Sequence, residues 1–155
     1  MIKVGILNVT GYAGAELARL LWQHPEVEIT GVTGRSAAGE KLGDIFPHLS
    51  DLGLIVKPEL DASVDIVFSA LPHNSSAEQV IPLLDQGARV VDLSADFRLK
   101  DSSEYSDWYG VEHPSLKHLQ ESVYGLTELH RNEISTSNLV ANPGCYSTAA
   151  ILALA

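Results

Sequence analysis

The sequence predicts a doubly wound α/β fold built on a mostly parallel sheet. Short apolar segments rich in β-branched residues alternate with segments of helical spacing along most of the chain. Continuously apolar strands in such an alternation are typical of a parallel sheet covered by helices on both faces. With 155 residues, 45% hydrophobic and 19% charged, the chain is long enough to bury one substantial core.

Five segments have the composition of strands. Each is short and apolar, and glycine, proline or small polar residues that favour turns stand beside it. The five lie at residues 2–7, 27–33, 65–70, 89–93 and 139–141. Helical spacing follows the first, third and last of them: up to His24, up to about Gln86, where Gly87 ends the helix, and from Ala149 to Ala155.

Two long connections interrupt the alternation. About 20 residues rich in glycine, proline and polar side chains follow the second strand. Between Ser94 and Asn138, polar and aromatic residues replace periodic apolar ones, which predicts a long irregular insertion before the last strand. Its aromatic residues either contact a ligand or another part of the protein, or form a small cluster that pins the insertion. They are Tyr105, Trp108, Tyr109 and Tyr124.

The charge of the chain disfavours two classes of partner. Twenty Asp and Glu oppose ten Lys and Arg, so the formal charge is −10, which argues against binding to nucleic acid or to an anionic membrane. The single cysteine excludes an internal disulfide, no segment resembles a membrane span, and no signal peptide precedes the first strand. We therefore expect a cytoplasmic protein.

The last residues of the chain predict that more protein follows. Residues 149–155 form an apolar helical run without a Gly or Asn stop signal and without a polar last turn. We therefore expect residues 1–155 to be the first domain of a longer protein, truncated at its C-terminal end.

The turn after the first strand has the character of a dinucleotide-binding loop. Glycine at position 11 lets the backbone approach a pyrophosphate, glycine at position 14 lets the helix pack closely on the strand, and the helix N-terminus faces the anion. Asn8 stands where the usual pattern has glycine, and Asn also tolerates a left-handed backbone. The strand-turn-helix context favours a Rossmann-like cofactor site over a purely structural turn. The residues assigned to the cofactor here are Thr10, Gly11, Tyr12, Ala13 and Gly14.

The end of the second strand indicates which dinucleotide binds. Enzymes that use NAD usually place an Asp or Glu there on the ribose 2′-hydroxyl, but this chain has Arg35 and Ser36. A guanidinium and a hydroxyl suit a 2′-phosphate, so we predict NADP(H) in preference to NAD(H). The alternative is that Arg35 is a solvated loop charge.

The turn after the third strand lies at the same type of sheet edge. Leu71, Pro72 and His73 are assigned to the ribose or nicotinamide half of the cofactor. The segment could equally be a plain turn in which Asn74 or Ser75 caps the next helix. No spacing of histidines suggests a metal site. The other five are expected at the surface or in turns: His24, His48, His113, His118 and His130.

The only cysteine stands where a turn gives way to an apolar helix. Pro143 and Gly144 stop the last strand, which places Cys145 in the first turn of the helix. Free backbone N–H groups and the positive end of the helix dipole stabilise a thiolate there. The alternative is that Cys145 is a small buried hydrophobic residue.

Taken together, these motifs resemble the N-acetyl-γ-glutamyl-phosphate reductase family of arginine biosynthesis, within the wider semialdehyde dehydrogenase group. The blocks at residues 93–98 and 142–146 are specific to this family in combination. Three residues depart from the family pattern: Asn8 where glycine is usual, and Thr127 and Ser147 where proline is common. The matching segments span nearly the whole chain in family order, at residues 11–17, 24–27, 34–39, 46–49, 70–73, 92–99, 108–110, 124–126 and 142–146.

The resemblance implies a reductase of two domains. Its Cys145 thiolate attacks N-acetyl-γ-glutamyl phosphate, and hydride from NADPH reduces the resulting thioester to the semialdehyde. A second, mixed α/β domain would supply a catalytic histidine and the subunit contacts of a homo-oligomer, so residues 1–155 alone are expected to be inactive. A reductase of carrier-linked aminoadipyl or glutamyl phosphate in lysine biosynthesis, a dehydrogenase acting on aspartyl phosphate and a nucleotide-binding module without chemistry stay open as alternatives.

Arg98 and Asn142 are assigned to the substrate. Arg98 follows a strand, at the edge where open α/β sheets bind their ligands. Its guanidinium could hold the leaving phosphate with two hydrogen bonds, oriented by Asp96; alternatively, Arg98 and Asp96 form a structural pair that braces the insertion. Asn142 opens the block that contains Cys145.

Overall fold

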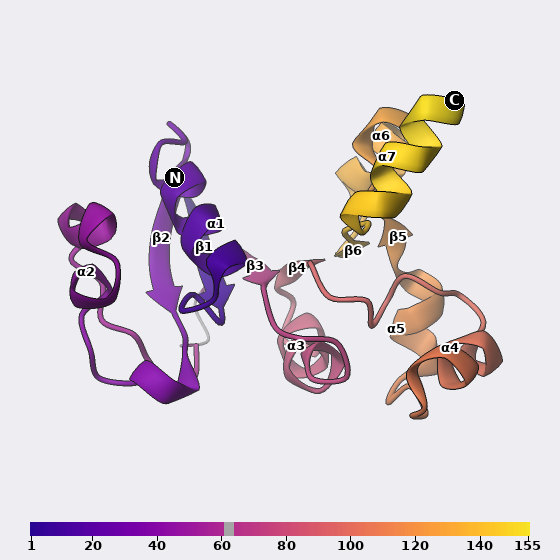
Figure 1. Ribbon diagram of the computed structural model, residues 1–155, viewed down its shortest axis with the longest axis horizontal. Coiled ribbons are helices and arrows are strands. Elements are labelled where there is room, and N and C mark those ends of the chain that lie inside the picture. Colours follow the sequence, from indigo (N-terminus) through magenta and orange to yellow (C-terminus); the bar gives the residue numbers. More distant parts are fainter. Residues whose placement is uncertain (61–63) are drawn as a thin grey trace. The chain divides into compact units, whose positions relative to one another are not determined.

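The computed structural model describes residues 1–60 and 64–155 of the chain. The chain forms two compact units, residues 1–70 and 71–155, and each has its own strands and helices (Figure 1). No helix within the described ranges is long and apolar enough to cross a membrane.

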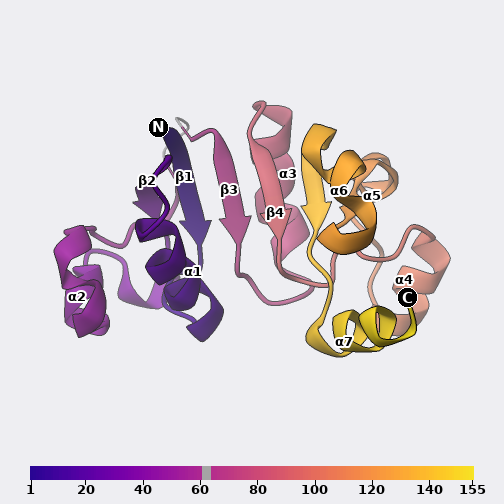
Figure 2. The ribbon, with the colours of Figure 1, turned by 90° about the horizontal axis from the view of Figure 1, so that it is seen from above.

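The described part of the first unit contains three parallel strands with β1 in the centre (Figure 2). β1 (Ile2–Leu7) pairs with β2 (Val27–Val32) on one side and with β3 (Ile66–Ser69) on the other. α1 (Tyr12–Trp22) connects β1 to β2. These elements lie within two residues of the ranges predicted from the apolar runs and the leucine spacing.

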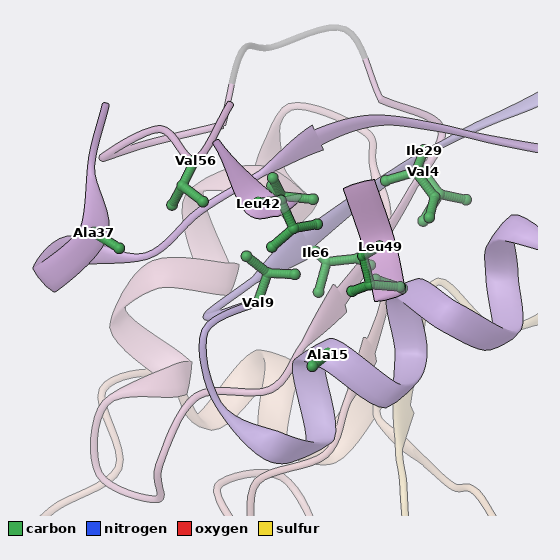
Figure 3. Close-up of a cluster of buried hydrophobic side chains, with 11 residues drawn as sticks. Val4, Ile6, Val9, Ala15, Ile29, Ala37, Leu42, Leu49 and Val56 are labelled. Carbon is green, nitrogen blue, oxygen red and sulfur yellow. The ribbon is translucent and has the colours of Figure 1, made fainter. Parts of the chain in front are cut away.

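The connection after β2 is more regular than the sequence predicts. In place of a loop it forms a 3₁₀ turn, η1 (Arg35–Ala37), a short helix, α2 (Leu42–Ile45), and a second 3₁₀ segment, η2 (Pro47–Leu52). Leu42 and Leu49 point into the core beside Ile6 of β1 (Figure 3), and both are fully buried. Burying a leucine side chain contributes roughly 1.5–3 kcal/mol, so tertiary packing stabilises helical turns too short to form alone.

The described part of the second unit also contains three parallel strands. β4 (Arg89–Asp92) and β5 (Val123–Tyr124) pair with β6 (Leu139–Ala141), which lies between them. α3 (Ser76–Asp85) precedes β4, and α7 (Cys145–Leu154) begins beyond the carboxyl end of β6 (Figure 2). Gly87 ends α3 as predicted, with a left-handed φ of 93°.

The expectation of an irregular insertion between Ser94 and Asn138 is corrected. The segment contains α4 (Ser102–Tyr109), α5 (Leu116–Glu121), the edge strand β5 and α6 (Thr127–Thr136). Asp101 and Ser115 cap α4 and α5 through their side chains. Because these helices are short and mostly polar, their apolar periodicity is weak, and a few buried anchors hold them. The anchors are Phe97, Tyr105, Leu119 and Leu126.

Candidate functional site

Asn8 anchors the turn after β1 through two hydrogen bonds. This residue has φ 61°, a left-handed conformation that Asn tolerates. Its side-chain Nδ2 donates to the carbonyl of Ala70 at 2.9 Å, and its backbone N–H donates to the Thr33 hydroxyl at 3.3 Å. The side chain of Asn8 therefore ties the turn after β1 to the residue that follows β3, a contact that glycine could not make.

The structure requires glycine at position 14 but not at position 11 of this turn. A Cβ on Gly14 would lie 2.3 Å from the carbonyl oxygen of Asn8 and 2.7 Å from Cα of Val9, so only glycine lets α1 pack this closely on the turn. Gly11 is the N-cap of α1 with φ −82° and ψ 160°, which any residue can adopt. No side chain caps the helix at Gly11, so the first N–H groups of α1 stay available to an anion.

Replacing Asn8 by alanine is expected to lower the free energy of unfolding by about 2 kcal/mol, because the change loses one hydrogen bond and places alanine in a left-handed conformation. Replacing it by glycine loses only the hydrogen bond, and about 1 kcal/mol is expected. Thermal or denaturant unfolding of both variants measures the difference. Equal losses would contradict a strained backbone at this position.

The turn after β2 lies against the turn after β1. A Cβ on Gly34 would lie 2.8 Å from Cγ2 of Thr10, so Thr10 packs on the residue that precedes Arg35. Arg35 and Ser36 are both exposed in η1, and Arg35 has no hydrogen bond or ion pair within the described residues. The first unit thus brings Thr10, at the turn after β1, against Gly34, which precedes Arg35.

Cys145 is the first residue of α7, and its side chain is exposed. It therefore does not pack as a buried hydrophobic residue. No side chain caps α7 at Gly144, which leaves the first backbone N–H groups of this helix unpaired within it. The thiol thus lies beside free donors and the positive end of a helix dipole.

The turn before Cys145 is braced by Arg98. Nε of Arg98 donates to the carbonyl of Asn142, and Nη2 donates to the carbonyl of Leu93, each at 2.9 Å. A Cβ on Gly144 would lie 3.2 Å from Nη1 of Arg98, so the guanidinium lies against the residue that precedes the cysteine. Nη1 has no hydrogen bond within the described residues and stays free to bind an anion.

Asp96 does not pair with Arg98, which corrects both the expectation that Asp96 orients the guanidinium and the alternative of a structural Arg98–Asp96 pair. The carboxylate of Asp96 is fully buried and accepts hydrogen bonds from the first backbone N–H groups of α3 instead. Arg98 reaches backbone carbonyls, because the short turn after β4 points the two side chains to different neighbours.

Asn74 and Ser75 do not cap α3 in the way the sequence suggests. Ser75 is the N-cap, but its side chain makes no capping hydrogen bond. Asn74, like Asn8, is a non-glycine residue with a left-handed backbone, at φ 62°. Of the three residues assigned to the cofactor in this turn, Leu71 is half-buried, whereas Pro72 and His73 are exposed.

Sequence reasoning missed one pair that supports the cysteine turn. The hydroxyl of Tyr124 donates to Oγ of Ser147 at 3.2 Å, and Ser147 donates to the carbonyl of Gly144 at 2.9 Å. Ser147 is one of the departures from the family pattern. It lies three residues after Gly144, the N-cap of α7, and this spacing was the sequence signal that could have indicated the hydrogen bond. Gly125 completes the support, since a Cβ there would lie 3.1 Å from Cα of Asn142.

Two histidines predicted at the surface or in turns are buried. His113 is 7% exposed and packs edge-on against Phe97 and Tyr105, and burial lowers its pKa. His118 is 8% exposed, with Nδ1 at 2.8 Å from Oγ of Ser115. Within the described ranges, no group of three or more His, Cys, Asp or Glu side chains is arranged to hold a metal ion.

Comparisons with known proteins agree with this geometry. The family model described as "Semialdehyde dehydrogenase, NAD binding domain" matches residues 3–137. A relative from Dehalococcoides mccartyi, named N-acetyl-gamma-glutamyl-phosphate reductase, is 59% identical over 153 residues, covering 99% of this chain and 45% of the relative. One of the same name from Desulforudis audaxviator is 47% identical over 160 residues, covering 100% of this chain and 46% of the relative. The chain thus spans about half the length of the curated relatives it matches.

Solved structures show the same fold. Aspartate semialdehyde dehydrogenase II from Vibrio cholerae, complexed with ASA, matches with a TM-score of 0.68 and 20% identity over 99% of this chain and 45% of that chain. Aspartate semialdehyde dehydrogenase from Candida albicans, with NADP, matches with a TM-score of 0.57 and 24% identity over 74% of this chain and 41% of that chain.

The fold and the glycine turn therefore define a doubly wound, Rossmann-like domain of the dinucleotide-binding class, and the predicted fold class is confirmed. The chain belongs to the family of semialdehyde dehydrogenase NAD-binding domains. This confirms the resemblance inferred from the sequence motifs, and the family description agrees with a nicotinamide dinucleotide as the class of cofactor.

Proposed function

We propose that residues 1–155 form the NADP(H)-binding domain of an N-acetyl-γ-glutamyl-phosphate reductase, a cytoplasmic enzyme of arginine biosynthesis. The observation that carries the proposal is the exposed thiol of Cys145 at an uncapped helix start, with a free donor of Arg98 beside the preceding residue. The names of the relatives at 59% and 47% identity support this substrate over the alternatives.

The proposed reaction begins at Cys145. Its thiolate attacks the acyl carbon of the acyl phosphate, a carbon–sulfur bond forms, and inorganic phosphate leaves. NADPH, when bound, supplies the hydride that reduces the acyl group. The sulfur then departs as thiolate, and the free semialdehyde is released.

Arg98 and the start of α7 are suited to the phosphate. Nη1 of Arg98 is free and lies against Gly144, while the first N–H groups of α7 are uncapped. A guanidinium and a helix N-terminus both stabilise an anion. We propose that they hold the leaving phosphate, and that the side chain of Asn142 contacts the acyl group of the substrate. The side chain of Asn142 donates to the carbonyl of Pro143 at 3.2 Å, which leaves its Oδ1 available.

The first unit is suited to NADP(H). The uncapped start of α1, the close approach at Gly14 and the free Arg35 fit the pyrophosphate and the 2′-phosphate. Thr10, Gly11, Tyr12, Ala13 and Gly14 would hold the first group, and Arg35 and Ser36 the second. In the second unit, Leu71, Pro72 and His73 are proposed as contacts of the nicotinamide half.

Replacing Arg35 by alanine is expected to weaken NADPH binding by about 10- to 100-fold, because a charge-assisted hydrogen bond to a phosphate contributes about 1.5–3 kcal/mol. NADH binding should change little, since NADH lacks the 2′-phosphate. Fluorescence titration of both cofactors measures this. Arg19→Ala is the matched control: it removes the same charge from a residue that pairs with Glu16, and it should leave both affinities unchanged. Equal losses for NADPH and NADH in Arg35→Ala would contradict the assignment.

A second α/β domain would complete the active site. We propose that it follows residue 155, supplies the acid–base histidine and forms the contacts of a homo-oligomer. The lengths of the relatives support this, because residues 1–155 cover less than half of each. The α7 helix supports it too, since none of its residues is buried although nearly all are apolar.

The proposed function is tested with the intact protein in the reverse direction. With N-acetylglutamate 5-semialdehyde as substrate, the added NADP⁺ should be reduced to NADPH only when inorganic phosphate is present. Aspartate semialdehyde and the carrier-linked semialdehydes serve as competing substrates in parallel assays. Faster turnover of either, or turnover that does not need phosphate, would overturn the proposal.

A further inference from the structure

The N-terminus of α3 is capped from a distant part of the second unit. Oδ1 of Asp96 accepts the backbone N–H of Asn74 at 2.8 Å, and Oδ2 accepts those of Ser76 and Ala77 at 3.1 and 2.9 Å. Asp96 is fully buried, so water cannot replace these bonds. A carboxylate that accepts several N–H groups at a helix N-terminus forms strong, charge-assisted bonds. Asp96 therefore fixes the turn after β3 as well as the helix that follows it.

A side-chain contact supports that turn. Asn74 has φ 62°, a left-handed conformation that Asn tolerates better than other non-glycine residues but adopts less freely than glycine. The hydroxyl of Tyr105 lies 3.3 Å from Oδ1 of Asn74 and 3.5 Å from Oδ1 of Asp96. Burial and the nearby charge of Asp96 raise the pKa of Tyr105 to about 12, so this hydroxyl keeps its proton and remains a donor.

A column of rings extends the support to His73. Tyr105 packs on Tyr109 with ring centroids 4.9 Å apart, and Tyr109 packs on His73 at 6.2 Å. On its other side, Tyr105 meets the buried His113 edge-on at 5.0 Å. The turn that carries Pro72 and His73 is thus supported by α4, a helix of the segment after β4.

We propose that Asp96 and Tyr105 are positioning residues for the cofactor, which hold residues 71–74 in the conformation that binds NADPH. The inference rests on the proposed function, because it takes NADPH as the ligand of this turn. Neither residue has to touch the cofactor. Asp96 fixes the backbone of the turn, and Tyr105 favours the left-handed conformation of Asn74.

The test compares two phenylalanine variants of the intact protein. Tyr105→Phe removes the hydroxyl that reaches Asn74 and keeps the ring. It should weaken NADPH binding about five- to tenfold, the effect of one hydrogen bond. Tyr109→Phe is the matched control, because the Tyr109 hydroxyl makes no hydrogen bond within the described residues, and its NADPH affinity should stay within about twofold of wild type. Both affinities are measured by fluorescence titration well below the unfolding temperature.

A rescue variant separates positioning from general stability. Glycine adopts a left-handed backbone without strain, so adding Asn74→Gly to Tyr105→Phe should recover most of the lost NADPH affinity. A double variant as weak as Tyr105→Phe would overturn the inference, and so would a Tyr105→Phe protein that melts earlier but binds NADPH like wild type. Failure of the proposed function would be seen separately, as wild-type protein that does not bind NADPH or does not act on the acyl-phosphate substrate.

Discussion

Replacing Cys145 by alanine in the intact protein is expected to abolish semialdehyde formation, with a loss of about a thousandfold or more. The reason is that no other described side chain beside the start of α7 offers a comparable nucleophile; the neighbouring Ser147 hydroxyl is already hydrogen-bonded to Gly144. NADPH affinity should stay within about twofold of wild type, because the thiol does not bind the cofactor in this mechanism. Steady-state assays and cofactor titration measure the two effects.

The control for this variant is Tyr146→Phe, which changes the exposed side chain next to the cysteine and should leave turnover unchanged. Alkylation provides a second measurement. Alkylation of the exposed Cys145 thiol should remove the activity in parallel with the extent of modification. If the alanine variant or the alkylated protein still produced semialdehyde, Cys145 would not be the nucleophile of the reaction.

Replacing Gly14 by alanine is expected to lower the free energy of unfolding by about 3 kcal/mol, despite the better helix propensity of alanine. The added methyl group would meet the backbone of Asn8 and Val9 at 2.3 and 2.7 Å, and backbone atoms cannot rotate away. For a chain of this size, the melting temperature should fall by roughly 10 °C. Thermal unfolding measures the effect.

Gly11→Ala is the matched partner of this change and should behave in the opposite way. Its nearest neighbour would be Nδ2 of Asn8 at 3.3 Å, in a side chain that can adjust, so stability should change by less than about 1 kcal/mol. NADPH binding should weaken by about tenfold or more, because the methyl group occupies the approach to the pyrophosphate. A Gly11→Ala protein that binds NADPH like wild type would show that the pyrophosphate lies elsewhere.

Local sequence signals predicted the elements that carry the site. The apolar runs predicted β1, β3 and β6, and the pair Pro143 and Gly144 predicted a helix that starts at Cys145. The left-handed backbone of Asn8 agrees with the tolerance of Asn for this conformation. These predictions succeeded because strand periodicity, turn residues and helix caps act over a few neighbouring positions.

Local signals did not predict the helices in the two long connections or the partners of the polar residues. Leu42 and Leu49 form helical turns only because the core of the first unit buries them. Asp96 was expected beside Arg98, two residues away, but it caps a helix that begins 20 residues earlier in the chain. Such contacts depend on which backbone groups the fold leaves unpaired. The residues next to Asp96 in the sequence therefore do not indicate which groups it will bind.

The sequence by itself determined the class of fold, the glycine turn after β1 and the position of the cysteine, because each depends on short-range rules for strands, glycine turns and helix starts. Only the tertiary structure decided what holds these parts in place: Arg98 on the carbonyls of Asn142 and Leu93, and Asp96 on the start of α3. Buried donors and acceptors must find partners wherever the folded chain brings them, and that pairing exists only once the strands have assembled.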